Sequence, residues 1–456
     1  MTTILRITLA TLACTAVLPT MAATYTVNKT ADTFDGTCDS DCSLREAVQA
    51  ANLHPGVDLI RLPAGRYALS LGTAGVSDEQ DNSVGDLDIS GALDIAGAAR
   101  DTTIIDGGYR DRVLEILPGA SFRATGLTIT KGQSTNASTR GSGILNAGSA
   151  MLRNTRITDN GTHPSTAASG GTGIANLGIL TLENCSIDNN AVSGNGGGLF
   201  NSGTLYLRRS VVNANTAQGG AGGGLLNDGS AYIEQSLFSG NSASQSFGRG
   251  GFAIYNAGSM EVSNTTVSGN FNQIAEDFAS DLVGAVHNFG TMSLSFVTIT
   301  NNIGGGLYND IGTISLSGTL IAGNLTAQLM REPSEEDDDV SFDPYIEPSY
   351  DGFFANCINE SIYTSQNTVV SVNGSCTGEQ YVDNASIGTL IEPLRLGGGV
   401  TATHKPRRGS LLVDAIDPSS GLGACEAVDQ RGARRPPNDD GRRGLRCDIG
   451  AYELLQ

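Results

Sequence analysis

One motif recurs seven times between residues 141 and 324, and it constrains the fold more than any other feature of the chain. Each copy runs from a glycine cluster through an aliphatic residue, a variable residue and an asparagine into a short turn and an alternating segment. The first asparagine stands at Asn146, Asn176, Asn201, Asn227, Asn256, Asn288 and Asn309. A second follows fourteen residues later in six copies and fifteen later in the last, at Asn160, Asn190, Asn215, Asn241, Asn270, Asn302 and Asn324. A fixed interval between variable gaps indicates rigid units joined by loops, which is typical of a solenoid.

Apolar residues alternate within each copy, as Leu205 and Leu207 do after Asn201. A period of two is the pattern of a strand with one face inward. No copy shows the three- and four-residue spacing of an amphipathic helix, so the repeat is not helical. Stacked copies place like residues above one another at the inter-strand spacing of about 4.8 Å. The sequence therefore predicts an all-β parallel β-helix.

The asparagine columns have two interpretations, because asparagine side chains can bind sugars or metal ions as well as stabilise turns. A turn residue repeated on every coil lets each side-chain amide hydrogen-bond to the next one. Asparagine also tolerates the left-handed backbone of a tight corner. We therefore expect the first asparagine of each copy to form one internal ladder along the axis, and we assign the glycine clusters to sharp corners.

The outward residues seven positions past the first asparagine alternate in charge on successive coils: Arg153, Glu183, Arg208 and Glu234. Opposite charges on adjacent strands attract, so we interpret these residues as surface ion pairs rather than catalytic groups. Tyr206 and Tyr232 also fall on adjacent coils. They form either a cross-strand aromatic pair or a platform for a sugar ring, and the pattern favours the first.

The first 23 residues have the features of a secretory signal peptide. Arg6 precedes an apolar run over residues 7–18, and the small residues Thr20, Ala22 and Ala23 follow it. The run is too short to span a bilayer, and no later segment of the sequence is apolar and long enough to do so. We therefore expect a protein that is secreted to the extracellular space or the outer cell surface, with no transmembrane segment in the mature chain.

The chain carries 47 Asp and Glu residues against 27 Lys and Arg residues, a net charge of −20. Contacts from basic residues to phosphates supply most of the affinity of nucleic-acid-binding proteins. We therefore expect no nucleic-acid partner. An acidic surface suits an exported protein that stays soluble and collects divalent cations.

Of eight cysteines, Cys14 lies in the signal segment and six form close sequence pairs. In an oxidising compartment this spacing predicts three disulfides: Cys38–Cys42, Cys357–Cys376 and Cys425–Cys447. Cys185 stands in a column otherwise filled by small residues, so we expect a free thiol inside the coil that behaves as a small hydrophobe.

The open ends of a solenoid need caps. A strand over residues 25–27 and an amphipathic helix over residues 42–52 are predicted at the N-terminal end, where Ser43 and Glu46 form a capping box. Leu44, Ala47, Val48 and Ala51 form the face of that helix that would cover the first coil. The predicted organisation is a signal peptide (1–23), an N-terminal cap with first coils (24–112), β-helix repeats (113–330), an acidic loop insertion (331–351), and C-terminal coils with a disulfide-stapled cap (352–456).

The terminal motifs resemble those of exported bacterial proteins. Residues 42–47, Cys-Ser-Leu-Arg-Glu-Ala, resemble the signature of the CSLREA-domain family, as do the segments at 85–89 and 105–107. Residues 429–432, 435–436 and 447–453 are similar to the closing signature of choice-of-anchor Q proteins, and the repeats are similar to those of polymorphic outer-membrane proteins and pectin-lyase-like β-helices. This resemblance implies export and a right-handed parallel β-helix, and it implies no established catalytic residue.

Many parallel β-helices cleave acidic polysaccharides. A pectate-type lyase needs carboxylates that hold calcium and an Arg or Lys that takes the proton, and a β-helical hydrolase needs an Asp cluster for acid and base work. Neither pattern occurs, and the four histidines are scattered without evident partners: His54, His163, His287 and His404. We therefore predict a non-enzymatic β-helix whose elongated surface binds a glycan or a cell-surface partner. The alternative is a polysaccharide lyase or glycoside hydrolase acting on an acidic, pectin-like polysaccharide.

The acidic insertion over residues 331–351 carries nine carboxylates. A solvated loop is the favoured interpretation, and weak calcium binding through Asp337, Asp338 and Asp339 is the alternative, because carboxylate oxygens are the ligands that calcium prefers. The spacing of an EF-hand is absent, and no cofactor is required. Asp78, Glu79, Asp81 and Asp86 form a smaller acidic patch with the same two interpretations.

Overall fold

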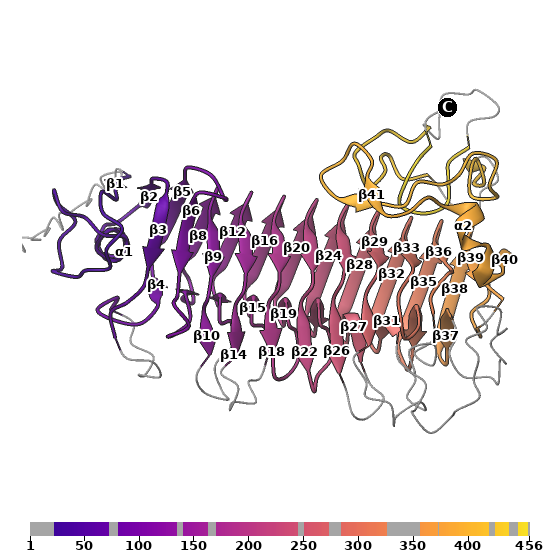
Figure 1. The fold of residues 1–456 in the computed structure, drawn as a ribbon, viewed down its shortest axis with the longest axis horizontal. Helices are drawn as coiled ribbons and strands as arrows, with labels where there is room; N and C mark the ends of the chain where they lie inside the picture. The colour runs from indigo at the N-terminus through magenta and orange to yellow at the C-terminus, as the bar shows by residue number, and fades with distance from the viewer. Residues whose placement is uncertain are drawn as a thin grey trace, which may run out of the picture.

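The computed structural model of this protein describes residues 22–72, 81–134, 140–162, 170–244, 250–272, 284–325, 356–372, 374–418, 425–436 and 446–454. Over these residues, short parallel strands stack into an elongated β-helix that runs from the helix α1 at one end to the strand β40 at the other (Figure 1). The prediction of an all-β parallel β-helix is confirmed. Calcium ligands predicted at residues 337–339 and the signal segment up to residue 21 lie outside the described residues.

Sheet A has twelve strands. In spatial order they are β1 (Thr24–Thr26), β2 (Val57–Leu62), β5 (Ala92–Gly97), β8 (Ser121–Thr125), β12 (Ser149–Arg153), β16 (Ile179–Glu183), β20 (Thr204–Arg208), β24 (Ser230–Glu234), β28 (Ser259–Ser263), β32 (Thr291–Ser295), β35 (Thr313–Ser317) and β38 (Ile362–Gln366).

Sheet B also has twelve strands. They are β3 (Gly65–Ala68), β6 (Thr103–Asp106), β9 (Thr128–Thr130), β13 (Arg156–Thr158), β17 (Ser186–Asp188), β21 (Val211–Asn213), β25 (Leu237–Ser239), β29 (Thr266–Ser268), β33 (Thr298–Thr300), β36 (Leu320–Ile321), β39 (Val369–Ser371) and β40 (Gln380–Val382).

Two further sheets complete the coils. Sheet C consists of β4 (Leu87–Ile89), β7 (Leu114–Ile116), β11 (Ile144–Asn146), β15 (Ile174–Asn176), β19 (Leu199–Asn201), β23 (Leu225–Asn227), β27 (Gly251–Asn256), β31 (Gly284–Asn288), β34 (Leu307–Asn309) and β37 (Cys357–Asn359). Sheet D consists of β10 (Gln133–Ser134), β14 (Gly161–Thr162), β18 (Ala191–Val192), β22 (Thr216–Gln218), β26 (Ser242–Ser244) and β30 (Phe271–Asn272).

The register follows the repeat. Leu205 and Leu207 of β20 pair with Ala231 and Ile233 of β24, and all four side chains are buried in one continuous core. Because alternate residues of a strand point to opposite faces, the same pairing places Tyr206 beside Tyr232 on the outside.

Two asparagine ladders run through the buried corners of the coil. In the first, each Nδ2 donates to the Oδ1 of the next asparagine at 2.6–2.8 Å, from Asn146 through Asn176, Asn201, Asn227, Asn256 and Asn288 to Asn309. It continues to Asn359, which the repeat did not reveal. The second ladder begins at Asn160 and extends beyond Asn324 to Asn356 and Asn384. Both columns therefore serve the fold, since their amides are engaged with one another.

One residue in the left-handed conformation turns the chain from sheet A to sheet B. Asn184, Arg209 and Gln235 occupy this corner in successive coils, with φ of 54°, 48° and 54°. A side chain at such a corner projects from the edge between the two sheets. The corner row therefore places Arg209 beside Arg208, the last residue of β20.

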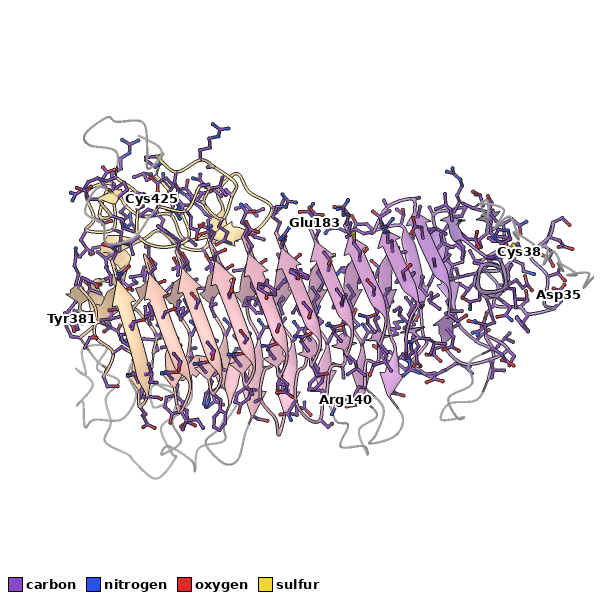
Figure 2. All side chains as sticks on the ribbon, turned by 180° about the vertical axis from the view of Figure 1, so that it is seen from behind. Asp35, Cys38, Arg140, Glu183, Tyr381 and Cys425 are labelled. Carbon is purple, nitrogen blue, oxygen red and sulfur yellow. A yellow bond between two sulfur atoms is a disulfide. The ribbon has the colours of Figure 1, made fainter. Side chains whose placement is uncertain are left out.

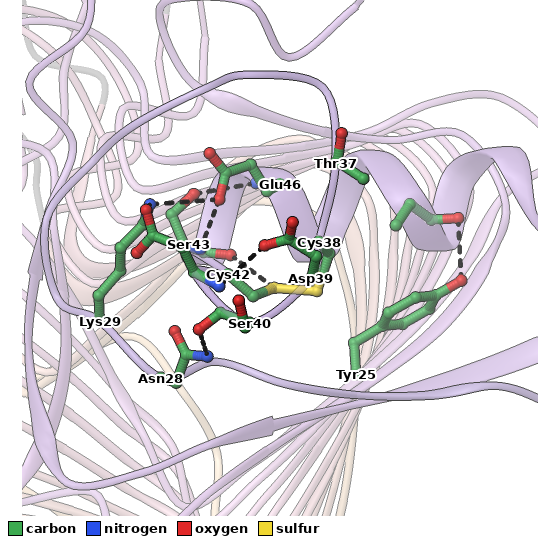
Figure 3. The surroundings of a disulfide bond; sticks show 12 residues. Tyr25, Asn28, Lys29, Thr37, Cys38, Asp39, Ser40, Cys42, Ser43 and Glu46 are labelled. Atoms are coloured by element: carbon green, nitrogen blue, oxygen red, sulfur yellow. Dashed lines mark hydrogen bonds and ion pairs between the residues drawn. A yellow bond between two sulfur atoms is a disulfide. The ribbon is translucent and has the colours of Figure 1, made fainter.

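The N-terminal end is capped by α1 (Leu44–Leu53), which begins with the predicted capping box of Ser43 and Glu46 (Figure 3). Leu44, Ala47, Val48 and Ala51 are buried against the first coil. Arg45 is also fully buried, and it donates to the Asp32 carboxylate at 2.8 Å and to the carbonyl oxygens of residues 82, 84, 85 and 86. The resemblance to the CSLREA signature thus falls on residues with structural roles.

Disulfides join the three cysteine pairs that the spacing predicted: Cys38–Cys42, Cys357–Cys376 and Cys425–Cys447. Cys185 is a buried free thiol whose Sγ lies 3.3 Å from the backbone oxygen of Leu152. Burial raises its pKa to about 11, so the reactive thiolate is disfavoured.

The sequence predicted that the last part of the chain forms a cap, but its described residues pack along the side of the coil. After η2 (Asn384–Ser386) and α2 (Ile387–Leu390), residues 391–418, 425–436 and 446–454 fold back over the edge between sheets A and B (Figure 1). We call these residues the C-terminal strap; they include the antiparallel pair β41 (Arg395–Leu396) and β42 (Ala402–Thr403). Apolar residues of the strap such as Ile416 and Ile449 pack with Phe296 and Leu320 of the coil. That apolar patch lies on the side of the β-helix, and this is why the strap docks there.

Polar residues anchor the strap as well. Thr266 Oγ1 donates to Gln430 Oε1 at 2.6 Å, and Ala451 N donates to Thr298 Oγ1 at 3.0 Å. Arg435 is buried, lies over the ring of Phe296 at 4.2 Å and binds Glu453 at 2.8 Å. The residues that resemble the choice-of-anchor Q signature therefore attach the strap to the coil. No helix in the described part of the chain is long and apolar enough to cross a membrane.

Candidate functional site

A short stretch of the edge between sheets A and B is left open between two raised segments. In the other coils this connection has two residues, but between β5 and β6 it has five, residues 98–102. This loop leans over the neighbouring coil, where Thr128 Oγ1 donates to the backbone oxygen of Arg100 at 2.6 Å. It forms the wall on the N-terminal side.

The C-terminal strap forms the other wall. Gln235, the corner residue that follows Arg209 in the stack, donates through Nε2 to the backbone oxygen of Asp429 at 2.9 Å. Its own carbonyl oxygen accepts from Thr401 Oγ1 at 3.2 Å. The open stretch spans three coils. The corner residues Gly126 and Gln235, which the two walls cover, are four coil steps apart, or about 19 Å. Figure 2 labels Glu183 on this edge, between the N-terminal part of the coil and the strap that carries Cys425.

We call this region the saddle. It is lined by Arg153, Arg156, Glu183, Asp188, Arg208 and Arg209.

Glu183 lies at the centre of the saddle between two guanidinium groups. Its Oε2 is 2.9 Å from Nε of Arg153, and its Oε1 accepts from Arg209. On the next coil Arg208 is paired with Glu234 at 3.5 Å. The charges that alternate in the sequence are therefore neighbours in the sheet, and the predicted ion pairs are present.

Asp188 binds the fourth arginine. Arg156 Nε donates to Asp188 Oδ1 at 3.0 Å, and Thr158 and Ser186 donate to the same carboxylate at 3.0 and 2.7 Å. Burial opposes ionisation of Asp188, but these hydrogen bonds and the charge of Arg156 outweigh it, so its pKa is lowered. An ionised carboxylate with this many donors is unsuited to acid or base catalysis near neutral pH.

Exposure differs between the two charges of these pairs. The side chains of Arg156 and Arg209 are 42% and 43% exposed, whereas those of Asp188 and Glu183 are 7% and 21% exposed. The carboxylates lie underneath and the guanidinium groups lie above them. An arginine has five N–H donors, so a guanidinium that binds one carboxylate keeps donors for a second anion. The saddle therefore presents cations on a protein of strongly negative net charge.

The tyrosine pair lies beside the saddle on sheet A. The rings of Tyr206 and Tyr232 are stacked with their centroids 5.1 Å apart and an interplanar angle of 12°. Each ring turns one face to the other, and the register places Thr181 and Glu261 next to the two rings on the adjoining coils. This geometry fits the cross-strand pair better than the sugar platform.

The prediction that the histidines have no partners is wrong for the three that the structure describes. His54 binds Asp58 at 3.0 Å, and His404 of the strap binds Ser268 Oγ of the coil at 2.9 Å. His287 is buried on sheet C between the rings of Tyr255 and Tyr308, at centroid distances of 5.2 and 4.6 Å. The contacts of His287 and His404 join distant strands or segments, which the sequence hides, whereas Asp58 is only four residues from His54 and was overlooked. His163 lies outside the described residues.

Asp86 does not belong to an exposed acidic patch, as the sequence suggested. It is buried next to Asp88 and Glu115, and carboxylate oxygens of the three lie within 4.8 Å of one another. Arg112 donates to Asp86 at 2.6 Å and also binds Glu115. Because this buried cation already neutralises part of the cluster, we assign the group to the N-terminal coils as an ion-pair network.

Sequence reasoning found half of the saddle. The residues seven past each first asparagine were selected as a column, but Arg156, Asp188 and Arg209 were not. Arg209 stands at a corner row whose other members are uncharged, and Arg156 and Asp188 occur in different columns of adjacent coils. Arg156 and Asp188 meet because their coils are adjacent in the stack. A comparison of residues within one column does not reveal a contact between two columns.

No known protein family and no curated protein matches this chain. Among solved structures, the pectate lyase Pel9A is 13% identical with a TM-score of 0.45, covering 95% of this chain and 96% of that one. A pectin methylesterase is 11% identical with a TM-score of 0.30, covering 80% and 94%. The A-module of the Azotobacter vinelandii mannuronan C-5 epimerase AlgE4 is 13% identical with a TM-score of 0.27, covering 76% and 96%. At these values the likeness extends to the parallel β-helix and carries no activity to this chain. The resemblance to the CSLREA-domain and choice-of-anchor Q families stays a prediction.

Proposed function

We propose that this protein binds an anionic polysaccharide, carboxylated or sulfated, at the saddle. The observation that carries the proposal is a group of four half-exposed arginines, three of which lie above the largely buried carboxylates of Glu183 and Asp188, while Arg208 pairs with the more exposed Glu234. Guanidinium groups form forked hydrogen bonds to carboxylate and sulfate oxygens, and neighbouring pairs hold them in place before a ligand arrives.

The negative net charge favours a sparsely charged partner. Duplex DNA carries one charge per about 1.7 Å, and its binding depends on many simultaneous basic contacts. The saddle offers four arginines within three coils, surrounded by an acidic protein. An acidic glycan with one charged group per sugar matches this small set better than a nucleic acid does. The three disulfides fit a secreted or cell-surface protein that would meet such a glycan.

A second candidate function is cleavage of the same class of polymer by a lyase reaction. It is favoured by the same arginines, because a guanidinium beside a uronate can neutralise the carboxylate while a base removes the neighbouring proton. The carboxylates of the saddle are occupied by hydrogen bonds and are unsuited to that proton transfer. We therefore place binding first and treat cleavage as a measurable alternative.

The test is a binding titration of the purified protein with polygalacturonate, alginate, a sulfated glycosaminoglycan and neutral dextran. We expect binding to at least one anionic polymer, weakened by salt, and none to dextran. The double variant Arg156→Gln, Arg209→Gln should lose affinity by about tenfold or more, since each removed charged hydrogen bond contributes roughly 1.5–3 kcal/mol.

Arg395→Gln is the matched control, because Arg395 is also a half-exposed arginine paired with a glutamate but lies on the strap. It should bind like the unmodified protein. Absence of binding to every anionic polymer, or equal losses in the control and the double variant, would refute the proposal. Absorbance near 235 nm in the same mixtures reports unsaturated products, and an increase that depends on Arg156 and Arg209 would establish the lyase instead.

A further inference from the structure

The walls of the saddle restrict the direction in which a long ligand can lie. We propose that the anionic chain crosses the β-helix, from sheet A over the edge to sheet B, rather than running along the helix axis. This inference rests on the proposed function, since it assigns the path of the ligand over the same arginines.

Arg66 is a further arginine along the helix axis, but it lies on the far side of the wall formed by residues 98–102. Arg66 pairs in register with Ile104, Ile104 with Thr128, and Thr128 with Arg156, so the two arginines share one outward column. Both bind an aspartate of the next coil, Asp106 and Asp188 respectively. The loop of residues 98–102 belongs to the coil between them and covers the column at Thr128. A straight chain along the axis would meet this loop before it reached Arg66.

The strap closes the axial path at the other side. Leu237 follows Val211 in the same column and is buried, because the strap begins to cover the coil at Gln235. The Cys425–Cys447 disulfide and the buried Arg435 hold the strap in the docked position that forms this wall. An axial ligand is therefore limited to three coils.

The arginines of the saddle lie on both sides of the edge between sheets A and B. Arg153 and Arg208 are the last residues of strands of sheet A, Arg209 occupies the corner, and Arg156 lies on sheet B. On sheet A, near Arg208, the outward side chain of Tyr232 is 39% exposed, so a ligand can reach the sheet A side of the saddle. Arg208 and Arg209 lie two coil steps, or about 10 Å, along the axis from Arg156, so a chain that crosses the saddle obliquely meets cations on sheet A, on the corner and on sheet B in turn. The charges are placed for a crossing ligand.

The experiment compares three single variants in the titration with the anionic polymer that binds best. Arg208→Gln removes a cation on the sheet A side, Arg156→Gln removes one on the sheet B side, and Arg66→Gln removes the matched cation beyond the loop. We expect losses of about tenfold for each of the first two and less than about twofold for the third.

Equal losses for Arg66→Gln and Arg156→Gln would show an axial ligand, and a loss for only one of Arg208→Gln and Arg156→Gln would show a ligand that does not cross. Either result overturns the path while leaving polysaccharide binding in place. Absence of binding by the unmodified protein would refute the proposed function itself. Arg156→Lys keeps a charge beside Asp188 without the forked geometry, and an intermediate loss from this variant separates ligand binding from damage to the fold. Melting temperatures of all variants provide the same check.

Discussion

At the scale of single residues, asparagine has a structural role in this protein. Asn227 donates to Asn256 Oδ1 at 2.8 Å and to the backbone oxygens of Gly229 and Ser259 at 3.2 and 3.1 Å. It also accepts from Asn201 at 2.6 Å. Asn227 thus satisfies backbone oxygens of two coils as well as its neighbours, and Asn176, Asn201, Asn256 and Asn288 do the same. A side chain of the same size without an amide could not do this.

Replacing Asn227 by alanine should lower the free energy of unfolding by about 1–3 kcal/mol, because buried oxygens and the Asn201 amide lose their partners. Chemical denaturation of the purified protein measures this change. Asn213→Ala is the control, since Asn213 is an outward, half-buried asparagine on β21. A change in Asn227→Ala no larger than in the control would show that water replaces the lost partners.

At the scale of elements, the C-terminal strap is the main departure from the regular stack of coils. It joins segments 150 or more residues apart in sequence, as the contact between Ala451 and Thr298 shows. Buried titratable groups lie in this segment. Burial and the neighbouring Asp448 raise the pKa of Glu453 to about 7, although Arg435 binds it. Glu453 is surrounded by Asp448, Asp429, Arg431 and Arg435, so its protonation alters a connected network.

Strap docking should therefore weaken as the pH rises. A carboxyl group whose pKa is higher in the folded than in the unfolded state stabilises the fold most below its unfolded pKa, and this contribution is lost as the pH rises through the folded value. For Glu453 this window runs from about pH 4.5 to about pH 7. Hydrogen exchange of residues 446–454 should accelerate over this range, and Glu453→Gln should remove most of that dependence.

Glu261→Gln is a suitable control, because Glu261 is exposed on sheet A. His404 contributes in the opposite direction. Burial lowers its pKa, so its contribution is present above the ordinary histidine pKa of about 6.5 and is lost as the pH falls below it. An identical pH profile in the Glu453→Gln variant and the unmodified protein would contradict the assignment to Glu453.

At the scale of the whole molecule, the net charge is negative whereas the charge exposed at the saddle is positive. The chain has a net charge of −20, yet the saddle exposes Arg156 and Arg209, whose carboxylate partners are mostly covered. Net charge describes long-range repulsion and solubility, whereas binding depends on which atoms are exposed at one place. The acidic insertion at residues 331–351 contributes nine of the negative charges and lies outside the described residues.

We expect that insertion to be a solvated loop, so millimolar calcium should not raise the melting temperature of the protein beyond a general screening effect. The variant in which Asp337, Asp338 and Asp339 are changed to asparagine should then melt in the same way with and without calcium. A ligand that binds only the folded state stabilises it by mass action. A calcium-dependent rise that the triple variant abolishes would instead identify these residues as a metal site.

The sequence by itself determined the coil, because its strands are specified locally. Alternating apolar residues, a corner asparagine and a fixed interval dictate the same stacking in every copy, and the cap helix is encoded within eleven consecutive residues. The tertiary structure alone decided where the C-terminal residues dock, which partners His287 and His404 have and which charges are exposed. Those features depend on contacts between distant segments, such as Gln235 with Asp429, and on one-coil displacements, such as Arg156 with Asp188. The saddle exists only because a five-residue loop and the strap leave three coils open between them.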